Sequence, residues 1–456
     1  MSNKHYPHII LGAGVTGLSL AHHLNKKGLS FKVIEKAKRH GGVVHTKSEK
    51  GFVYESGPNS GIVSHPEVVA LFDELGDAIK VEKGNDLVKV RYVLKNGEWH
   101  ALPSSMKLAV TTPLFTFKDK LRVLGEPFRK KGNNPDESLA DLVKRRLGNS
   151  FLDYAIDPFI LGIYAGDPAM LIPRHALPKL YNLEQNYGSF IKGAIKKRKE
   201  PKTELEQRTD RAVFSFEGGL SQLTDALLKS AGKDNFTFGA EELSVSYNDG
   251  LYTVSYTLDG EKQVVTCDKL ITTFGSTGFK EALPFISEEE MTHLTNLKYA
   301  RVVEVALGFN KWNGRALDGF GGLIPHKEKR DLLGVLFMSS LFKERAPEGG
   351  ALLSVFMGGI RNEALCDLDD EQLMKVLESE LKDIMKMDAF NPSMVDIMRY
   401  SHAIPQYAIN SGDRFDAIER VQKKYNGLFI AGNLRDGIGM ADRIKQATLL
   451  ADKLVE

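Results

Sequence analysis

The sequence is poor in cysteine, with only Cys267 and Cys366 among its 456 residues. Two cysteines about a hundred positions apart exclude a disulfide framework, a cysteine-rich zinc site and a CxxC redox pair. Such sparing use of cysteine fits a reducing compartment, so we expect a cytoplasmic protein. Histidine does not suggest a metal either. His22 and His23 are adjacent, so their side chains are expected to diverge on a helix, and no metal site is predicted.

Long apolar runs and an excess of one charge are also missing. The longest apolar stretch near the middle, residues 159–172, is broken by Asp167 and Pro168, so no membrane span is expected. Residues 1–7 lack the pattern of a secretory signal peptide. The net charge of +2 argues against a nucleic-acid partner bound by bulk charge. A chain that is 42% hydrophobic and 26% charged is not wholly disordered, and its length predicts two or three domains.

The chain does have a nucleotide-binding unit at its start. Residues 8–11 form an apolar run that predicts a buried parallel strand, and apolar residues then recur at helical spacing over 18–24. Between them lies Gly12-Ala13-Gly14-Val15-Thr16-Gly17. A second strand at 31–34 ends at Glu35. This order of strand, glycine turn, helix, strand and acidic residue predicts a dinucleotide site.

Four positions in this unit have a physical role. Gly12 permits the tight turn, and Gly14 lets a pyrophosphate approach the main chain at the positive end of the helix. Gly17 lets the helix pack closely on the strand. Glu35 can accept hydrogen bonds from ribose hydroxyl groups.

Further glycine-rich segments predict FAD rather than a nicotinamide cofactor. Gly41-Gly42 follows the second strand, Gly57-Pro58-Asn59-Ser60 comes soon after, and residues 432–440 connect an apolar run to a final helix. Several such segments suit a large ligand that lies flat against main chain, so the two chain ends are expected to fold together. The predicted cofactor-binding residues are Gly12, Ala13, Gly14, Val15, Thr16, Gly17, Glu35, Lys36, Gly41, Gly42, Gly57, Pro58, Asn59, Ser60, Gly432, Asn433, Gly437, Ile438, Gly439 and Met440.

These motifs resemble the flavin amine oxidase superfamily, and stretches in the middle are similar to its protoporphyrinogen oxidase family. The more specific blocks are Tyr164-Ala165-Gly166-Asp167-Pro168 and Pro405-Gln406-Tyr407, and the resemblance covers nearly the whole chain in order. It implies an FAD enzyme of haem biosynthesis that oxidises protoporphyrinogen IX to protoporphyrin IX. O2 would be the electron acceptor, with hydrogen peroxide released, and a homodimer is one option.

The resemblance also implies a substrate site. Arg91 matches an arginine that pairs with a substrate propionate, and a guanidinium fork suits a carboxylate. Leu323 and Leu336 match a pair that sandwiches the tetrapyrrole, and Phe356 matches a stacking aromatic. The segment from Gly162 to Gly166 matches the main chain beside the reacting carbon. Leu243 matches a main-chain contact to adenine. No catalytic acid or base is assigned, because hydride would pass to the flavin itself.

The predicted fold class is α/β, with a Rossmann-like FAD-binding domain built from both chain ends. Its segments are residues 1–86, 203–273 and 401–456. An inserted mixed-sheet substrate domain takes residues 87–103 and 274–400, and residues 104–202 form a helical subdomain.

The helical subdomain is basic, with 18 Lys and Arg against 10 Asp and Glu over residues 104–202. One interpretation is a solvated helical face. The other is docking on an anionic membrane surface, which would make the protein peripheral on the cytoplasmic face.

Three alternatives to the main interpretation remain. Coproporphyrinogen III has four carboxylates, so an oxidase for it should need more cations than Arg91 alone. An amine oxidase or a carotenoid desaturase could share the scaffold, although the block at 164–168 is not expected there. A non-catalytic flavin-binding protein is the third.

Overall fold

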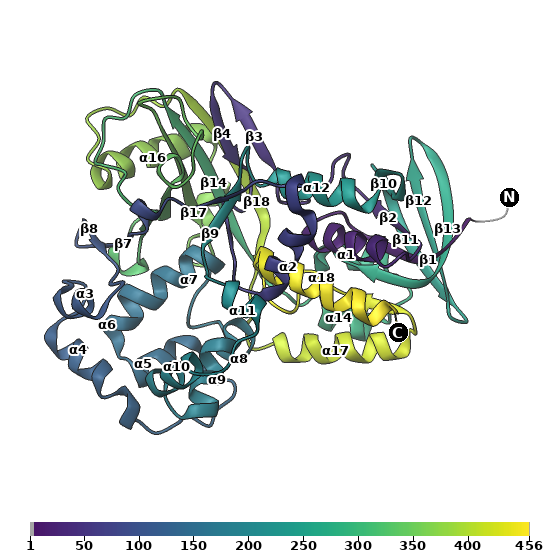
Figure 1. The fold of residues 1–456 in the computed structure, drawn as a ribbon, viewed down its shortest axis with the longest axis horizontal. Helices are drawn as coiled ribbons and strands as arrows, with labels where there is room; N and C mark the ends of the chain where they lie inside the picture. Colours follow the sequence, from purple (N-terminus) through teal and green to yellow (C-terminus); the bar gives the residue numbers. More distant parts are fainter. Residues whose placement is uncertain (1–3, 456) are drawn as a thin grey trace.

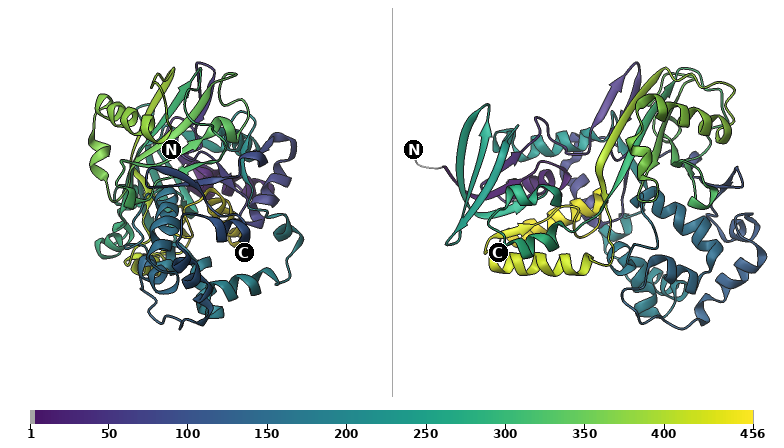
Figure 2. Two further views of the ribbon diagram at one scale, coloured as in Figure 1. Left: turned by 90° about the vertical axis from the view of Figure 1, so that its left-hand side faces the viewer. Right: turned by 180° about the vertical axis from the view of Figure 1, so that it is seen from behind.

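The computed structural model describes residues 4–455, so residues 1–3 and 456 of the predicted FAD-binding domain lie outside the described residues. The chain forms three parts: an α/β part built from both chain ends, a second sheet covered by one long helix, and a lobe of short helices (Figure 1, where the lobe is blue). The view from behind in Figure 2 shows the α/β part at one end of the molecule and the other two parts at the opposite end. This mixed α/β architecture confirms the predicted fold class.

The first sheet joins strands from the start, the middle and the end of the chain. Its strand order is β10-β2-β1-β13-β12-β11, with β19 also paired to β13. Strand β1 pairs in parallel with β2 and with β13, and β13 pairs in parallel with β19. The strands are β1 (Lys4–Leu11), β2 (Phe31–Glu35), β10 (Phe236–Phe238), β11 (Glu241–Asn248), β12 (Leu251–Leu258), β13 (Glu261–Thr272) and β19 (Leu428–Ile430).

Helices cover both faces of this sheet. On one face α1 packs between α12 and α18, and Ile10 points into that core. On the other face α13, α14 and α17 pack around Ile9 and Leu11. The N-terminal and C-terminal helices are therefore neighbours, as Figure 1 shows. The helices are α1 (Val15–Lys26), α2 (Pro66–Leu75), α12 (Ser221–Ala231), α13 (Phe279–Ala282), α14 (Glu288–Thr295), α17 (Ser411–Lys424) and α18 (Met440–Val455).

The second sheet has the strand order β18-β14-β17-β16-β15-β7-β8. One of its faces is buried against α16 (Asp370–Ile384) and carries apolar side chains such as Val303, Val335 and Val355. The other face lies toward segment 57–60, where the hydroxyl of Ser354 donates to the side-chain oxygen of Asn59 at 2.6 Å. The strands are β7 (Arg91–Lys95), β8 (Glu98–Ala101), β14 (Tyr299–Phe309), β15 (Gly321–Leu323), β16 (Leu332–Phe337), β17 (Ala351–Gly358) and β18 (Met394–Pro405), and the short α15 (Met338–Leu341) follows β16.

Two small sheets connect these parts. Strands β3 (Thr46–Glu49) and β4 (Phe52–Glu55) form a hairpin, and β9 (Val213–Phe216) lies between β5 (Gly61–Ile62) and β6 (Val81–Lys83). The hairpin lies on the second sheet, because a Cβ atom on Gly308 of β14 would be 2.9 Å from the ring of Phe52.

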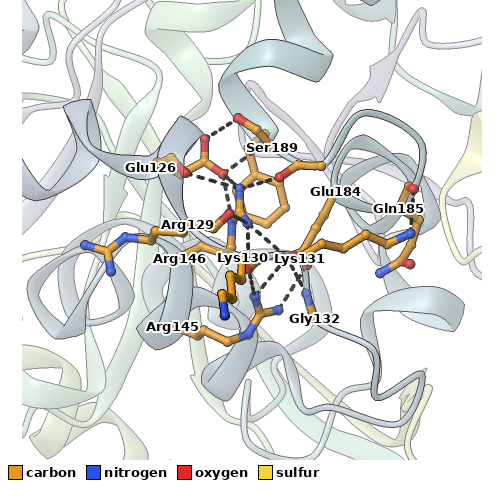
Figure 3. A network of polar contacts seen from close by, with 12 residues as sticks. Glu126, Arg129, Lys130, Lys131, Gly132, Arg145, Arg146, Glu184, Gln185 and Ser189 are labelled. Carbon is orange, nitrogen blue, oxygen red and sulfur yellow. Dashed lines mark hydrogen bonds and ion pairs between the residues drawn. The ribbon is translucent and has the colours of Figure 1, made fainter.

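The lobe of short helices contains a buried network of ion pairs (Figure 3). Arg146 and Glu126 are both fully buried and form an ion pair, and the guanidinium of Arg146 also lies 3.1 Å from Glu184. Ser189 donates to Glu126 at 2.6 Å. The helices are α3 (Met106–Thr111), α4 (Phe117–Leu124), α5 (Leu139–Arg146), α6 (Asn149–Phe151), α7 (Asp157–Tyr164), α8 (Pro173–Ala176), α9 (Pro178–Tyr187), α10 (Phe190–Arg198) and α11 (Glu204–Arg208).

Two predicted domain boundaries differ from the packing. Phe279, Leu283 and Leu294 are buried in the core of the first sheet, so this stretch belongs with that sheet and not with the substrate domain predicted from residue 274. Strand β18 runs to Pro405 in the second sheet, beyond the boundary predicted between residues 400 and 401. Burial of apolar side chains decides the first difference. The second follows from strand pairing, because Ile404 and Pro405 still pair with Ala300 and Tyr299 of β14.

Candidate active site

The first glycine loop joins β1 to α1. The N–H of Gly12 donates to the carbonyl oxygen of Ile34 at 2.9 Å, and α1 begins directly after Gly14. A Cβ atom on Gly17 would lie 2.0 Å from the carbonyl oxygen of Gly12, so only glycine fits there. On Gly14 the nearest atom to such a Cβ would be the Cα of Gly42 at 4.0 Å. The main chain at Gly14 is therefore open to a ligand phosphate at the positive end of α1.

Glu35 is oriented by main-chain amides. Its carboxylate accepts the N–H of Ala13 at 2.6 Å and the N–H of Ala37 at 2.8 Å, one on each oxygen. Each oxygen keeps a further lone pair for a ribose hydroxyl. The N–H of Ala240 donates to the Glu35 carbonyl at 3.0 Å, and Leu243 follows three residues later, at an irregularity in the β11–β12 pairing. Lys36 is exposed beside Glu35.

The second and third glycine segments lie against the first. The N–H of Gly41 donates to the carbonyl oxygen of Ala13 at 2.8 Å. A Cβ atom on Gly42 would be 3.1 Å from the Cα of Gly14, and one on Gly57 would be 2.2 Å from the carbonyl oxygen of Val43. Segment 57–60 therefore continues the same run of main chain, from the phosphate loop toward the second sheet.

The C-terminal glycine segment is held by two buried side chains. The Tyr407 hydroxyl accepts the N–H of Gly437 at 3.1 Å and lies 3.0 Å from the carbonyl oxygen of Asn433. The Arg443 guanidinium donates to the carbonyl oxygens of Gly432 and, at 2.8 Å, of Gly437. Burial lowers the pKa of Arg443. Ile438 and Met440 are half-buried, and Gly439 is exposed.

These segments fit a flavin dinucleotide. A ligand of that length needs an extended path of main chain, a helix N-terminus for its pyrophosphate and an acceptor for its ribose. Gly14 and α1 supply the helix N-terminus, Glu35 supplies the acceptor, and Gly42 and Gly57 extend the path. The predicted cofactor residues thus lie on adjoining segments, although contact of each with FAD stays a prediction.

The predicted substrate residues lie on one face of the second sheet. Gly321 pairs with Arg91 on β7 and with Leu336 on β16, and Gly334 pairs with Leu323 and with Phe356 on β17. Directly paired residues point to the same face, as do residues two apart along one strand. The side chains of Arg91, Leu323, Leu336 and Phe356 therefore share a face, which is opposite the one that α16 covers.

Helix α7 lies on that face. A Cβ atom on Gly162 would be 2.6 Å from the Cδ2 of Leu323, so this glycine allows the helix to touch the strand. A Cβ atom on Gly166 would be 2.4 Å from the side-chain oxygen of Gln406, which has no hydrogen-bond partner in the described structure. The N–H2 of Gln406 donates to the carbonyl of Tyr164 at 2.8 Å. Two glycines from one motif and the Pro405-Gln406-Tyr407 block thus meet beside the face that carries the predicted substrate residues.

Sequence reasoning missed Glu304, which lies on this same face through its pairing with Phe356. Its carboxyl group accepts the N–H of Gly57 at 3.1 Å and the side chain of Asn59 at 2.5 Å. Burial raises the pKa of Glu304 to about 8. A lone glutamate within the apolar run of residues 302–307 was the only signal in the sequence.

The expectation that His22 and His23 diverge is wrong. Both rings lie against Glu74: the Nε2 of His22 is 2.9 Å and the Nδ1 of His23 is 3.7 Å from the same carboxylate oxygen. Adjacent helical positions differ by about 100° in direction, but long side chains can bend toward a common partner. Lys26 pairs with the other oxygen of Glu74 at 3.1 Å. The two imidazoles and the ammonium group of Lys26 therefore share the carboxylate of Glu74.

Comparisons with known proteins agree with this geometry. Residues 15–447 match the family described as flavin containing amine oxidoreductase. The chain is 31% identical to protoporphyrinogen oxidase 2, chloroplastic/mitochondrial, of Arabidopsis thaliana, over 98% of this chain and 93% of that protein. It is 27% identical to the coproporphyrinogen III oxidase of Bacillus subtilis (strain 168), over 96% of this chain and 95% of that protein. A crystal structure of a protein from Exiguobacterium sp. 255-15 has the same fold, with a TM-score of 0.81, 24% identity and 99% of each chain covered.

The fold and the run of glycine segments thus define a flavin-dependent oxidoreductase. The chain belongs to the flavin containing amine oxidoreductase family, and FAD is its cofactor.

Proposed function

We propose that this enzyme oxidises a porphyrinogen, most specifically protoporphyrinogen IX to protoporphyrin IX, in haem biosynthesis. One observation carries the proposal: strand register brings Arg91, Leu323, Leu336 and Phe356 to one face, and Gly162 of α7 lies against it. The identity to the Arabidopsis thaliana enzyme over nearly both full lengths supports it.

The residues of this face suit a flat apolar ring with acidic substituents. Leu323, Leu336 and Phe356 are half-buried and offer apolar and aromatic contact, which a macrocycle needs. Arg91 is exposed at the start of β7, where its guanidinium can pair with a propionate. Bound FAD supplies the hydride acceptor. The protein's task is then to orient one carbon of the ring toward the cofactor segments and to exclude water.

Anaerobic mixing of the purified holoenzyme with protoporphyrinogen IX tests the proposal. We expect the visible absorption of the oxidised flavin to bleach, and protoporphyrin fluorescence to rise after air is admitted. A flavin that stays oxidised with protoporphyrinogen IX would contradict the proposal.

Coproporphyrinogen III is the second candidate substrate, because the Bacillus subtilis relative carries that name. The same mixing experiment with coproporphyrinogen III decides between the two. Faster flavin reduction by coproporphyrinogen III, at equal concentration, would favour the second candidate over the first.

We also propose that the lobe of short helices touches a membrane surface. Phe117, Leu121 and Leu124 form a stripe along α4 at helical spacing and are 75%, 50% and 62% exposed. Phe128, just beyond α4, is 87% exposed. The lobe also holds the predicted excess of basic residues, which suits an anionic surface. Within residues 4–455 the structure contains no helix that is both long enough and apolar enough to cross a bilayer.

The remaining parts of the proposal concern the acceptor, the location and the assembly. We propose O2 as the electron acceptor, and a peroxide assay during turnover would detect the hydrogen peroxide that forms from it.

The thiols of Cys267 and Cys366 are both buried and free, which suits a reducing compartment such as the cytoplasm. A homodimer would be visible as twice the chain mass in light scattering.

A further inference from the structure

Glu304 is a buried carboxyl group in the middle of β14, with only 1% of its surface exposed. It accepts two hydrogen bonds from segment 57–60, one from the N–H of Gly57 and one from the side chain of Asn59. A buried carboxyl group with two directed donors fixes the position of both. The oxidation chemistry proposed above does not use this group.

Both the nitrogen and the oxygen of the Asn59 carboxamide have hydrogen-bond partners in this arrangement. Its N–H2 group donates to Glu304 at 2.5 Å and to the carbonyl of Gly57 at 3.1 Å. Its oxygen accepts the hydroxyl of Ser354, on β17, at 2.6 Å. Glu304 and Ser354 therefore hold opposite ends of one carboxamide, and both side chains come from the second sheet.

The location of Glu304 connects the two halves of the candidate active site. Glu304 pairs directly with Phe356, so the two side chains are neighbours on the substrate face. Gly57 lies against Val43, in the run of main chain that leads back to the phosphate loop. The hydrogen bonds of Glu304 thus join the cofactor segments to the substrate strands.

We propose that Glu304 is a positioning residue, which acts through Asn59 and Gly57 to fix segment 57–60, and the bound flavin, relative to the face that carries Phe356. This inference rests on the proposed function for the identity of that face and on the predicted contact of segment 57–60 with FAD. Glu304 itself touches Asn59 and Gly57, so its effect on the flavin is indirect.

The charge state of Glu304 gives this role a signature. Burial, with smaller contributions from the negative charges of Glu55 and Asp396, raises its pKa to about 8, although the hydrogen bonds from Asn59 and Gly57 act to lower it. Lys47 neutralises Asp396 at 2.6 Å, and Arg345 lies 3.7 Å from Glu55. Burial, and to a smaller extent the charge of Glu304, raises the pKa of Tyr400 on β18, so its hydroxyl group stays neutral. Glu304 is therefore mostly protonated at neutral pH and ionises as the pH rises through about 8.

The experiment compares the wild-type holoenzyme with Glu304→Gln, Glu304→Leu and the control Glu380→Gln. Glu380 is a partly buried carboxylate on α16, on the opposite side of the same sheet, where it pairs with Arg330. We measure the visible flavin spectrum from neutral to alkaline pH and the dissociation constant for FAD, both without any porphyrinogen.

We expect the wild type and Glu380→Gln to show a spectral step near pH 8, and Glu304→Gln to lose it. Because the glutamine oxygen can accept only one of the two donors, Gly57 or Asn59, we expect Glu304→Gln to bind FAD more weakly than Glu380→Gln. Leucine would leave the N–H of Gly57 and one N–H of Asn59 without an acceptor, so we expect Glu304→Leu to weaken FAD binding ~10-fold or more. A step that persists in Glu304→Gln would overturn the proposal, as would unchanged FAD binding in Glu304→Leu.

Two provisions keep the test decisive. If Glu304→Leu does not fold, Glu304→Gln decides through both readouts, because FAD binding as tight as in Glu380→Gln would overturn the proposal even if the spectral step were lost. Because no porphyrinogen is present, a holoenzyme that fails to oxidise either porphyrinogen would count against the proposed function and leave the result for Glu304 standing.

Discussion

Single residues decide what the second sheet can bind. Arg91 places a cation on the face predicted to bind the substrate, since it starts β7 and pairs with Gly321. Its guanidinium lies 5.3 Å from the ring centre of Phe320, which supports the side chain without satisfying its hydrogen-bond donors. A propionate would satisfy them.

We therefore expect Arg91→Ala to raise the Michaelis constant for the porphyrinogen by roughly 10- to 100-fold, because a charge-assisted hydrogen bond contributes roughly 1.5–3 kcal/mol. Flavin reduction at saturating substrate should change much less, since the hydride acceptor is untouched. Stopped-flow reduction at varied substrate concentration measures both constants. Arg91→Lys keeps the positive charge but not the forked guanidinium, so its Michaelis constant should lie between those of the wild type and Arg91→Ala. An unchanged Michaelis constant in Arg91→Ala would remove the propionate role.

At the scale of elements, the lobe of short helices depends on the buried ion pairs drawn in Figure 3. Although burial alone would raise it, hydrogen bonds from Ser189 and Arg146 hold the pKa of Glu126 below its ordinary value. A group whose pKa is lowered by folding stabilises the fold above the unfolded value of 4.5 and loses that contribution as the pH falls below it. Glu126 thus links η3 (Glu126–Phe128) to α5 and α10 at neutral pH.

Glu126→Gln should therefore lower the free energy of unfolding at neutral pH by about 3–5 kcal/mol, the usual effect of removing one member of a buried pair. The difference from wild type should shrink as the pH falls below 4.5. Urea unfolding followed by circular dichroism checks both. The matched variant Glu137→Gln removes a carboxylate at the rim of the same network, which pairs with Arg145 at 2.7 Å, and should lose only about 1 kcal/mol or less. If the two variants lost the same free energy of unfolding, burial would not determine how much an ion pair contributes to stability.

The stripe on α4 leads to a different expectation at the same scale. Replacing Phe117, Leu121 and Leu124 by serine removes apolar side chains that contribute roughly 1.5–3 kcal/mol each when fully buried. Because all three are largely exposed, the fold should be unaffected, while binding to vesicles of anionic phospholipid should drop by ~10-fold or more. Vesicle sedimentation measures the bound fraction. Leu449→Ser, at a 49% exposed position on α18, is the control and should bind as wild type does.

At the scale of the whole molecule, the sequence predicted what is local and missed what depends on register. The strand, glycine turn and helix around Gly14 follow from local pattern, so they could be read directly. The common face of Arg91, Leu323 and Phe356 could not, because it requires the pairing of strands that are far apart in the chain. Glu304 was missed for the same reason. In the sequence it is a single charged residue within an apolar strand, and its role depends on Asn59, a hydrogen-bond partner far away in the chain. The resemblance supplied those substrate positions, and the register places them together.

The same long-range pairing makes the cofactor part of the fold's stability. Strand β13 from the middle of the chain lies between β1 from the start and β19 from the end, and the glycine segments predicted to bind FAD come from both chain ends. A ligand that binds only the folded state stabilises it by RT ln(1 + [L]/Kd), which is about 2.7 kcal/mol at a hundredfold excess over Kd. We therefore expect FAD to raise the Tm of the apoprotein by a few degrees in differential scanning calorimetry. Gly14→Asp should fold, since aspartate is a good residue to precede a helix, yet show no shift with FAD, because its carboxylate would repel the pyrophosphate. A full shift in that variant would mean that the phosphate loop at Gly14 does not hold the cofactor.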